Sequence, residues 1–276
     1  MIRASLAAPL AALAFATLAN PAHAGDPRLV ERLYDPSEVV RIQGKTKVQA
    51  TIMFEELLEL GHTGAEYDAW IVNIGEGDQF GSGFVDLNPN SKIPALEDRS
   101  GESPFRIFES GAILMHLAEK FGEFLPTEPV ARAEVLSWLF WQVGSAPFIG
   151  GGFGHFYAYA PVKIEYAIDR YSMETKRLFD VADKRLADER FLGGDDYTIA
   201  DIATYPWFAV FVKGLAYNDA KSFLSIDEYE HVTRWVNEIA ARPAVKRGQI
   251  VNRAMGDDNK KLLERHSAAD FEGKDI

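Results

Sequence analysis

The chain has 276 residues, 47% of them hydrophobic, which is enough for one large domain or two ordinary domains with a substantial core. Its 29 basic and 41 acidic residues give a net charge of −12, which argues against nucleic acid or an anionic membrane surface as a partner. The absence of cysteine excludes a disulfide framework, a cysteine-based metal site and a protein thiol nucleophile, and we expect no metal. Any thiol chemistry must use a sulfur that arrives with a ligand.

Residues 1–24 have the pattern of a secretory signal peptide. Arg3 supplies a basic start, Leu6 to Leu18 is rich in Ala and Leu, and Ala22-His23-Ala24 is a cleavage pattern before Gly25. The apolar run is too short for a membrane span, and no later segment is apolar and long enough to be one. We expect a periplasmic or secreted protein. The alternative is a misplaced start codon upstream of a cytoplasmic protein.

Residues 38–122 have the element order of a mixed α/β domain. From residue 38 onward the patterns are strand, helix, strand, loop, two strands and a helix. The order predicts a sheet with helices packed against it, as in a thioredoxin-like domain. The expected elements are a strand at Glu38–Gln43, a helix at Lys47–Gly61, a strand at Ala65–Ile74 and a loop at Gly75–Asn90.

The stretch from Asn88 to Gly122 carries the strongest functional signal in this domain. Pro94 opens a short strand, a second strand ends at Phe108, and Glu109-Ser110 begins an amphipathic helix. A helix N-terminus presents free N–H groups and a positive dipole end, which suit a small anionic ligand. The alternative is that Ser110 is an ordinary helix cap.

The rest of the chain predicts an all-α domain at residues 131–255, followed by a tail at 256–276. Gly122 to Val130 contains two prolines and is a plausible linker, and strand patterns are absent after it. The helices expected are 131–144, 161–189 (as one, as two, or kinked), 198–211 and 225–242.

Two motifs in the helical part have structural explanations. Thr198 and Asp201 have the spacing of a capping box, flanked by Tyr197 and Ile202 as a hydrophobic staple, which we favour over a catalytic Asp201. The glycine-rich segment that contains His155 and Tyr157 is not a phosphate-binding loop, because no strand precedes it and no Lys-Ser or Lys-Thr follows it.

The chain from Lys47 to about His266 resembles the nu-class glutathione transferases, the group of YghU-like disulfide reductases. The resemblance is carried by long strings in both predicted domains. They are Ala65–Trp70, Gly77–Phe80, Asn88–Pro94 and Phe108–Gly111 in the first, and Trp138–Trp141, Gly150–Tyr157, Ala160–Tyr166 and Arg242–Asn252 in the second.

The resemblance implies a glutathione site. Glu109 would pair with the γ-glutamyl ammonium, and Ser110 would hold the carboxylate of the same residue. A cis Pro94 would turn the backbone of Ile93 outward, so that its N–H and C=O bind the cysteinyl portion as an added strand does. Gln79 would reach the glycyl end or its surroundings.

The family also implies roles in the helical domain. Arg170 matches an arginine that contacts glutathione, although from its sequence context alone it is a solvated helix position. His155 and Tyr157 lie in a segment that is near the active cleft in this family.

The turn that holds the glutathione sulfur in the family is altered in this chain. Family members carry Thr-Pro-Asn-Gly there, whereas this chain has Gly44-Lys45-Thr46-Lys47. Thr46 can donate its hydroxyl, and Lys45 and Lys47 add positive charge, which lowers the pKa of a thiol. We therefore expect Thr46 to be catalytic.

These features predict a homodimeric, glutathione-dependent disulfide oxidoreductase with glutathione as co-substrate. The alternatives are an enzyme that conjugates glutathione to small electrophiles or reduces peroxides with it, and a non-catalytic glutathione-binding protein.

Overall fold

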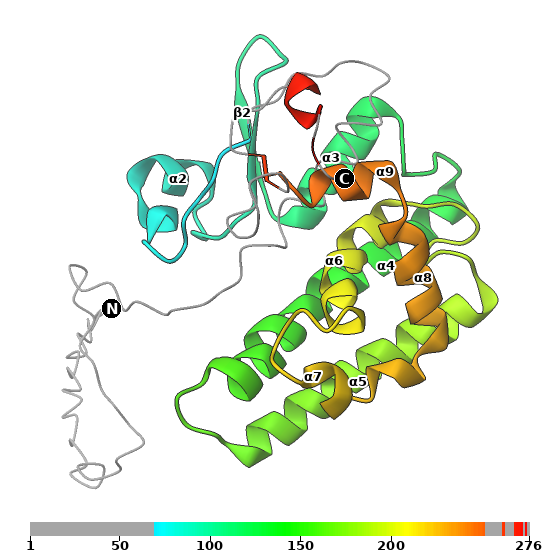
Figure 1. The fold of residues 1–276 in the computed structure, drawn as a ribbon. Coiled ribbons are helices and arrows are strands. Elements are labelled where there is room, and N and C mark those ends of the chain that lie inside the picture. The colour runs from blue at the N-terminus through cyan, green and yellow to red at the C-terminus, as the bar shows by residue number, and fades with distance from the viewer. Residues whose placement is uncertain (1–68, 252–260, 263–267, 273, 275–276) are drawn as a thin grey trace, which may run out of the picture. The chain divides into compact units, whose positions relative to one another are not determined.

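The computed structural model describes residues 69–251, 261–262, 268–272 and 274 (Figure 1). The expected signal peptide, the expected strand Glu38–Gln43 and the expected helix Lys47–Gly61 lie outside the described residues.

The first described segment differs from two expectations. The strand expected at Ala65–Ile74 is wrong over its described part, because Asn73 uses its backbone in a turn. Its N–H donates to Asp78 Oδ2 (2.8 Å), and its C=O accepts from the N–H groups of Glu76 and Asp78. The loop expected at Gly75–Asn90 is also wrong, since it contains the 3-10 helix η2 (Asp78–Phe80) and the helix α2 (Ser82–Leu87).

The expected strand, turn, strand and helix are confirmed. Strands β1 (Ala95–Asp98) and β2 (Phe105–Phe108) form an antiparallel pair, and helix α3 (Ser110–Phe121) follows at once. Apolar residues at helical spacing bury one face of α3, and Gly122 ends the helix with a positive φ of 74°. The buried apolar residues are Ile113, Leu114, Leu117 and Ala118.

Asp98 ties β1 to α3. Its side chain is 6% exposed, and its Oδ2 contacts both Lys120 Nζ (2.7 Å) and His116 Nε2 (2.8 Å) from successive turns of α3. Its Oδ1 accepts from the N–H and the hydroxyl of Ser100. The Lys120 ammonium, with the Ser100 donors and His116, holds the pKa of Asp98 well below its usual range despite burial.

The remainder is helical, as expected, and contains more elements than the sequence predicts. The expected helix 161–189 is one unbroken helix that begins later, at Glu165. No helix in the described ranges combines the length and hydrophobicity needed to cross a bilayer. The elements are α4 (Pro129–Pro147), η3 (Phe148–Tyr159), α5 (Glu165–Asp188), α6 (Ile199–Val212), α7 (Ala220–Phe223), η4 (Ile226–Glu228), α8 (Glu230–Ala240), α9 (Pro243–Gly248) and η6 (Ala268–Phe271).

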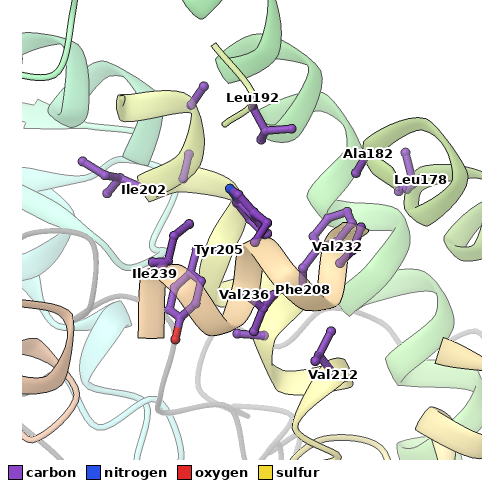
Figure 2. Packing of buried hydrophobic residues seen from close by; sticks show 14 of the residues in the cluster. Leu178, Ala182, Leu192, Ile202, Tyr205, Phe208, Val212, Val232, Val236 and Ile239 are labelled. Atoms are coloured by element: carbon purple, nitrogen blue, oxygen red, sulfur yellow. The ribbon is translucent and has the colours of Figure 1, made fainter. Parts of the chain in front are cut away.

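Helix α6 is the centre of the main hydrophobic core. It packs against α3, α4 and α8, and most of its residues are buried (Figure 1). Helix α8 faces it with one apolar stripe at spacings of three and four residues, which places those side chains on one side of the helix. Figure 2 shows Tyr205 and Phe208 of α6 against Val236 and Ile239 of α8.

The capping box of α6 is confirmed, and its carboxylate has further partners. Asp201 is fully buried and accepts from the N–H and hydroxyl of Thr198 (3.0 and 3.1 Å). It also accepts from the N–H of Leu192 and the indole N–H of Trp235, both at 2.9 Å. Burial raises the pKa of Asp201 to about 6 against the opposing effect of these four donors. Every bond of this carboxylate joins parts of the core, which supports the structural interpretation.

The glycine-rich segment forms η3, a π-helix that continues directly from α4. Its glycines let aromatic rings lie against the helix backbone. A Cβ atom on Gly152 would lie 2.3 Å from the ring of Tyr171, and one on Gly154 would lie 2.4 Å from the ring of Tyr217. These contacts explain the run of glycines by close packing.

A methyl group at position 152 tests this packing. We expect Gly152→Ala to lower the free energy of unfolding by about 1–3 kcal/mol, because the ring of Tyr171 must move. The matched control is Gly151→Ala, where no atom lies within 4 Å, and it should be neutral or stabilising by up to about 1 kcal/mol. Urea unfolding measures both, and equal destabilisation would contradict the explanation.

The Asp98 cluster makes stability depend on acid pH. Because the pKa of Asp98 is lower in the folded state, its contribution is complete above the unfolded pKa of about 3.9 and is lost as the pH falls below it. We expect Asp98→Asn to lower the free energy of unfolding by about 1–3 kcal/mol at pH 7. The difference in stability between wild type and variant should become smaller below pH ~4.

Thermal unfolding of wild type and variant across this range measures the effect. Glu102→Gln, at the exposed turn between β1 and β2, is the control and should change Tm much less at either pH. A deficit that stays constant down to low pH would show that the charge of Asp98 is not what stabilises the cluster.

Candidate functional site

The hairpin register brings two predicted site segments together. Ala95 pairs with Phe108 as the last pair of β1 and β2, so Pro94 and Glu109 follow at the same end of the hairpin. The Ile93–Pro94 bond is cis, as the resemblance implies. The two segments, about 15 residues apart in the chain, are therefore neighbours because of strand pairing.

The backbone of Ile93 is available to a ligand. Its N–H and C=O make no hydrogen bond to any residue that the structure describes. Asn88, which is 2% exposed, holds the preceding loop: its amide donates to the C=O of Lys92 (2.5 Å), and its Oδ1 accepts from the N–H of Asn90 (2.9 Å). Free backbone groups at such an edge can pair with an extended peptide.

Glu109 has a backbone conformation that is rare for a residue with a side chain. Its φ is 69° and its ψ 121°, and its side chain is exposed. Backbone in such a region costs about 1–3 kcal/mol and concentrates at functional sites. Glu109 thus lies directly before α3, at the same end of the hairpin as cis Pro94.

Ser110 is the first residue of α3 and does not cap it. Glu109 occupies the cap position, and no side chain makes a capping hydrogen bond there, so the cap interpretation of Ser110 is wrong. The first N–H bonded within the helix is that of Ile113, which donates to the C=O of Glu109 (3.0 Å). The N–H groups of residues 110–112 and the Ser110 hydroxyl are therefore open to an anion at a positive dipole end.

Gln79 lies in η2, in the same part of the fold. Helix η2 packs on α2, and α2 packs on both strands of the hairpin. Its Oε1 is buried without a hydrogen-bond partner among the residues that the structure describes. An orphaned buried oxygen is costly unless a ligand, water or another group supplies a donor.

Arg170 lies on the exposed side of α5. It pairs with Glu174 (3.4 Å), which also holds Arg177 at 2.6 Å, and the two arginines lower the pKa of Glu174. The structure does not place Arg170 beside the hairpin residues, so its contact with glutathione stays a prediction.

His155 and Tyr157 belong to η3. The hydroxyl of Tyr157 donates to Asp219 (2.7 Å), and its ring packs between those of Phe153 and Phe223. Burial and Asp219 raise the pKa of Tyr157 to about 12, so it is a neutral donor already engaged in the protein. The roles of both residues also stay predictions. Thr46, Lys45 and Lys47 lie outside the described residues.

The arrangement suits one end of a short anionic peptide. The helix mouth fits a carboxylate, Glu109 fits an ammonium group beside it, and the Ile93 edge fits extended backbone. Asn88 and Asp98, which support the site from outside, were not identified from the sequence. Asn88 has a local signal, because an Asn in a loop can bond nearby backbone groups. Asp98 has none, because His116 and Lys120 lie 18 and 22 residues further along the chain. No group of three or more His, Asp or Glu residues in the described chain could hold a metal.

Two family models match the chain. The N-terminal domain of glutathione S-transferases matches residues 48–119, and the C-terminal domain matches residues 134–243. The first domain has the thioredoxin-like fold and the second is helical, as expected.

Individual proteins are also similar over most of the chain. The disulfide-bond oxidoreductase YghU of Escherichia coli is 62% identical over 224 residues, which cover 81% of this chain and 77% of that protein. A crystal structure of glutathione transferase YghU from Streptococcus pneumoniae, complexed with glutathione, has a TM-score of 0.72 and 52% identity, covering 79% of this chain and 80% of that one.

A third similar structure contains a second ligand molecule. It is a glutathione transferase from Burkholderia graminis with two glutathione molecules per subunit (TM-score 0.66, 36% identity, covering 76% of this chain and 84% of that one). With both family models matched in order and the hairpin and helix mouth in place, the chain belongs to the glutathione S-transferase family.

Proposed function

We propose that this protein is a glutathione-dependent disulfide oxidoreductase. One observation carries the proposal: cis Pro94 and the uncapped mouth of α3 form a peptide-binding edge beside an anion-binding edge, in a chain that is 62% identical to a disulfide-bond oxidoreductase. The chain is therefore an enzyme of the family, with glutathione as its thiol substrate.

Different residues bind different parts of glutathione. Ser110 and the free N–H groups of α3 bind the γ-glutamyl carboxylate, and Glu109 binds the ammonium group of the same residue. The N–H and C=O of Ile93 bind the cysteinyl backbone, which positions the sulfur. Gln79 offers its Oε1, which lacks a partner among the described residues, towards the glycyl end.

The reaction follows from the absence of cysteine. The protein has no thiol, so the attacking sulfur belongs to glutathione. Its thiolate forms a bond to one sulfur of a disulfide substrate, whose S–S bond breaks and releases a thiolate that takes up a proton. A second glutathione thiolate attacks the mixed disulfide, so that two glutathiones yield one glutathione disulfide and two substrate thiols.

Thr46 is the residue we assign to activating the thiol. A hydroxyl that donates to the sulfur, with Lys45 and Lys47 adding positive charge, would lower the pKa of the thiol from about 8.5 towards neutrality. Conjugation of glutathione to electrophiles and reduction of peroxides use the same thiolate, so they are the alternative activities.

A disulfide reductase assay tests the proposal. Wild type should reduce 2-hydroxyethyl disulfide with glutathione. If the protein binds glutathione but turns over no disulfide, electrophile or peroxide, it is a binding protein and not an enzyme. Ser110→Ala should weaken glutathione binding by about ten- to a hundredfold, because a hydrogen bond to a charged group contributes about 1.5–3 kcal/mol.

Ser145→Ala, in the last turn of α4, is the control for the Ser110 variant and should leave the affinity unchanged. Isothermal calorimetry gives both affinities, and its stoichiometry tests whether each subunit holds one or two glutathiones. Unchanged glutathione affinity in Ser110→Ala would show that the N-terminus of α3 is not part of the binding site.

A homodimer is part of the proposal, and helix α4 offers a face for it. Ala133, Ser137, Phe140 and Gly144 follow one another at spacings of four, three and four residues, and all four are exposed. None of these four residues is charged, and Phe140 is 60% exposed. An uncharged face with a large exposed ring is typical of a protein–protein contact.

Substitution of Phe140 tests this face. We expect wild type to have the mass of a dimer by light scattering, and Phe140→Arg to shift it towards the monomer, since the interface would bury a charge. Leu215→Arg, at a 74% exposed loop position, is the control and should remain dimeric. A dimer that persists in Phe140→Arg would place the interface elsewhere.

We also propose export to the periplasm, supported by the signal-peptide pattern of residues 1–24. N-terminal sequencing of the natively produced protein should then find Gly25 first, and an intact Met1 would contradict export.

A further inference from the structure

A small hydrophobic cluster lies apart from the main core. Ile250, Val251 and Leu262 are 4%, 2% and 4% exposed, and Ala69 and Phe271 pack against them. Its members come from the two ends of the described chain: Ala69 precedes the glutathione-site segment, whereas the other four follow the last long helix.

Backbone bonding fixes the C-terminal side of the cluster. The N–H of Leu262 donates to the C=O of Ile250 (2.8 Å), and Leu262 forms a parallel bridge with Val251. Ile250 and Val251 follow α9 after one residue, Gln249, and α9 packs on α8. Leu262 is therefore anchored to the helical part of the protein.

The other side of the cluster leads to the site. From Ala69 the chain runs, without regular structure, to the turn in which Asn73 and Asp78 bond each other. Gln79 comes immediately after that turn. None of residues 69–81 is buried or packs against the main core. In the described chain the segment packs on α2 through η2, and on the small cluster through Ala69.

We infer that Leu262 is a positioning residue for the Gln79 side of the glutathione site. With Ile250 and Val251, Leu262 forms the cluster against which Ala69 packs. Ala69 precedes the Asn73–Asp78 turn, and Gln79 follows that turn. The inference rests on the proposed function. It assigns a role to the C-terminal segment in binding glutathione, with no direct contact between Leu262 and the ligand.

A cavity in the cluster tests the inference. Leu262→Ala should raise the KM and Kd for glutathione by about three- to tenfold, because a displaced binding group loses its alignment. It should leave kcat for 2-hydroxyethyl disulfide within about twofold, since the attacking sulfur is positioned by the backbone of Ile93. Leu262→Met nearly conserves volume and should restore the affinity.

The matched control is Leu224→Ala. Leu224 is fully buried in the main core between α7 and η4, so its truncation should lower Tm at least as much as Leu262→Ala does. It should leave the affinity for glutathione unchanged. If both variants bind glutathione equally weakly, Leu262 contributes only to overall stability, and the inference is overturned.

Hydrogen exchange separates this inference from the proposed function, because it needs no ligand. In Leu262→Ala the bonded amides of Glu76, Asp78 and Phe80 should exchange faster, while those within α3 should not change. Unchanged exchange at these amides would overturn the inference even if wild type is an active reductase. Faster exchange in a protein that binds no glutathione would instead overturn the proposed function.

Discussion

The contacts of one carboxylate with a lysine and a histidine hold the candidate site together. Asp98 at the end of β1 binds His116 and Lys120 of α3, and the hairpin register then places cis Pro94 beside Glu109 at the opposite end of the same strands. The backbone of Ile93 and the N-terminus of α3 thus have a fixed orientation relative to each other. Because Asp98 is nearly buried, solvent screens this contact less than an exposed ion pair.

The strain at Glu109 has a physical explanation in this arrangement. An ordinary cap would satisfy the first N–H groups of α3 with a side chain and close the helix mouth. Here the cap residue has a positive φ and Ser110 is inside the helix, so the donors stay open. The cost of about 1–3 kcal/mol is offset by the packing of α3 against the hairpin and core.

The two halves of the chain serve different needs. The helical part buries large aromatic side chains around α6, and the glycines of η3 let Tyr171 and Tyr217 lie against its backbone. That core anchors the C-terminal segment as well as α3. The thioredoxin-like part supplies the edges that suit an extended peptide, and the absence of cysteine leaves the reacting sulfur to glutathione.

The sequence by itself determined the hairpin, the helices and the capping box, because those depend on local periodicity and on residues three or four apart. It did not predict the turn at Asn73, which lies in a run with a strand pattern, or helix α2, which lies in a segment rich in Gly and Asp that is typical of a loop. The tertiary structure alone decided that Asp98 joins α3 and that Ala69 packs against the cluster of Ile250, Val251 and Leu262. These contacts join residues far apart in the chain, and no local pattern specifies which of them will meet.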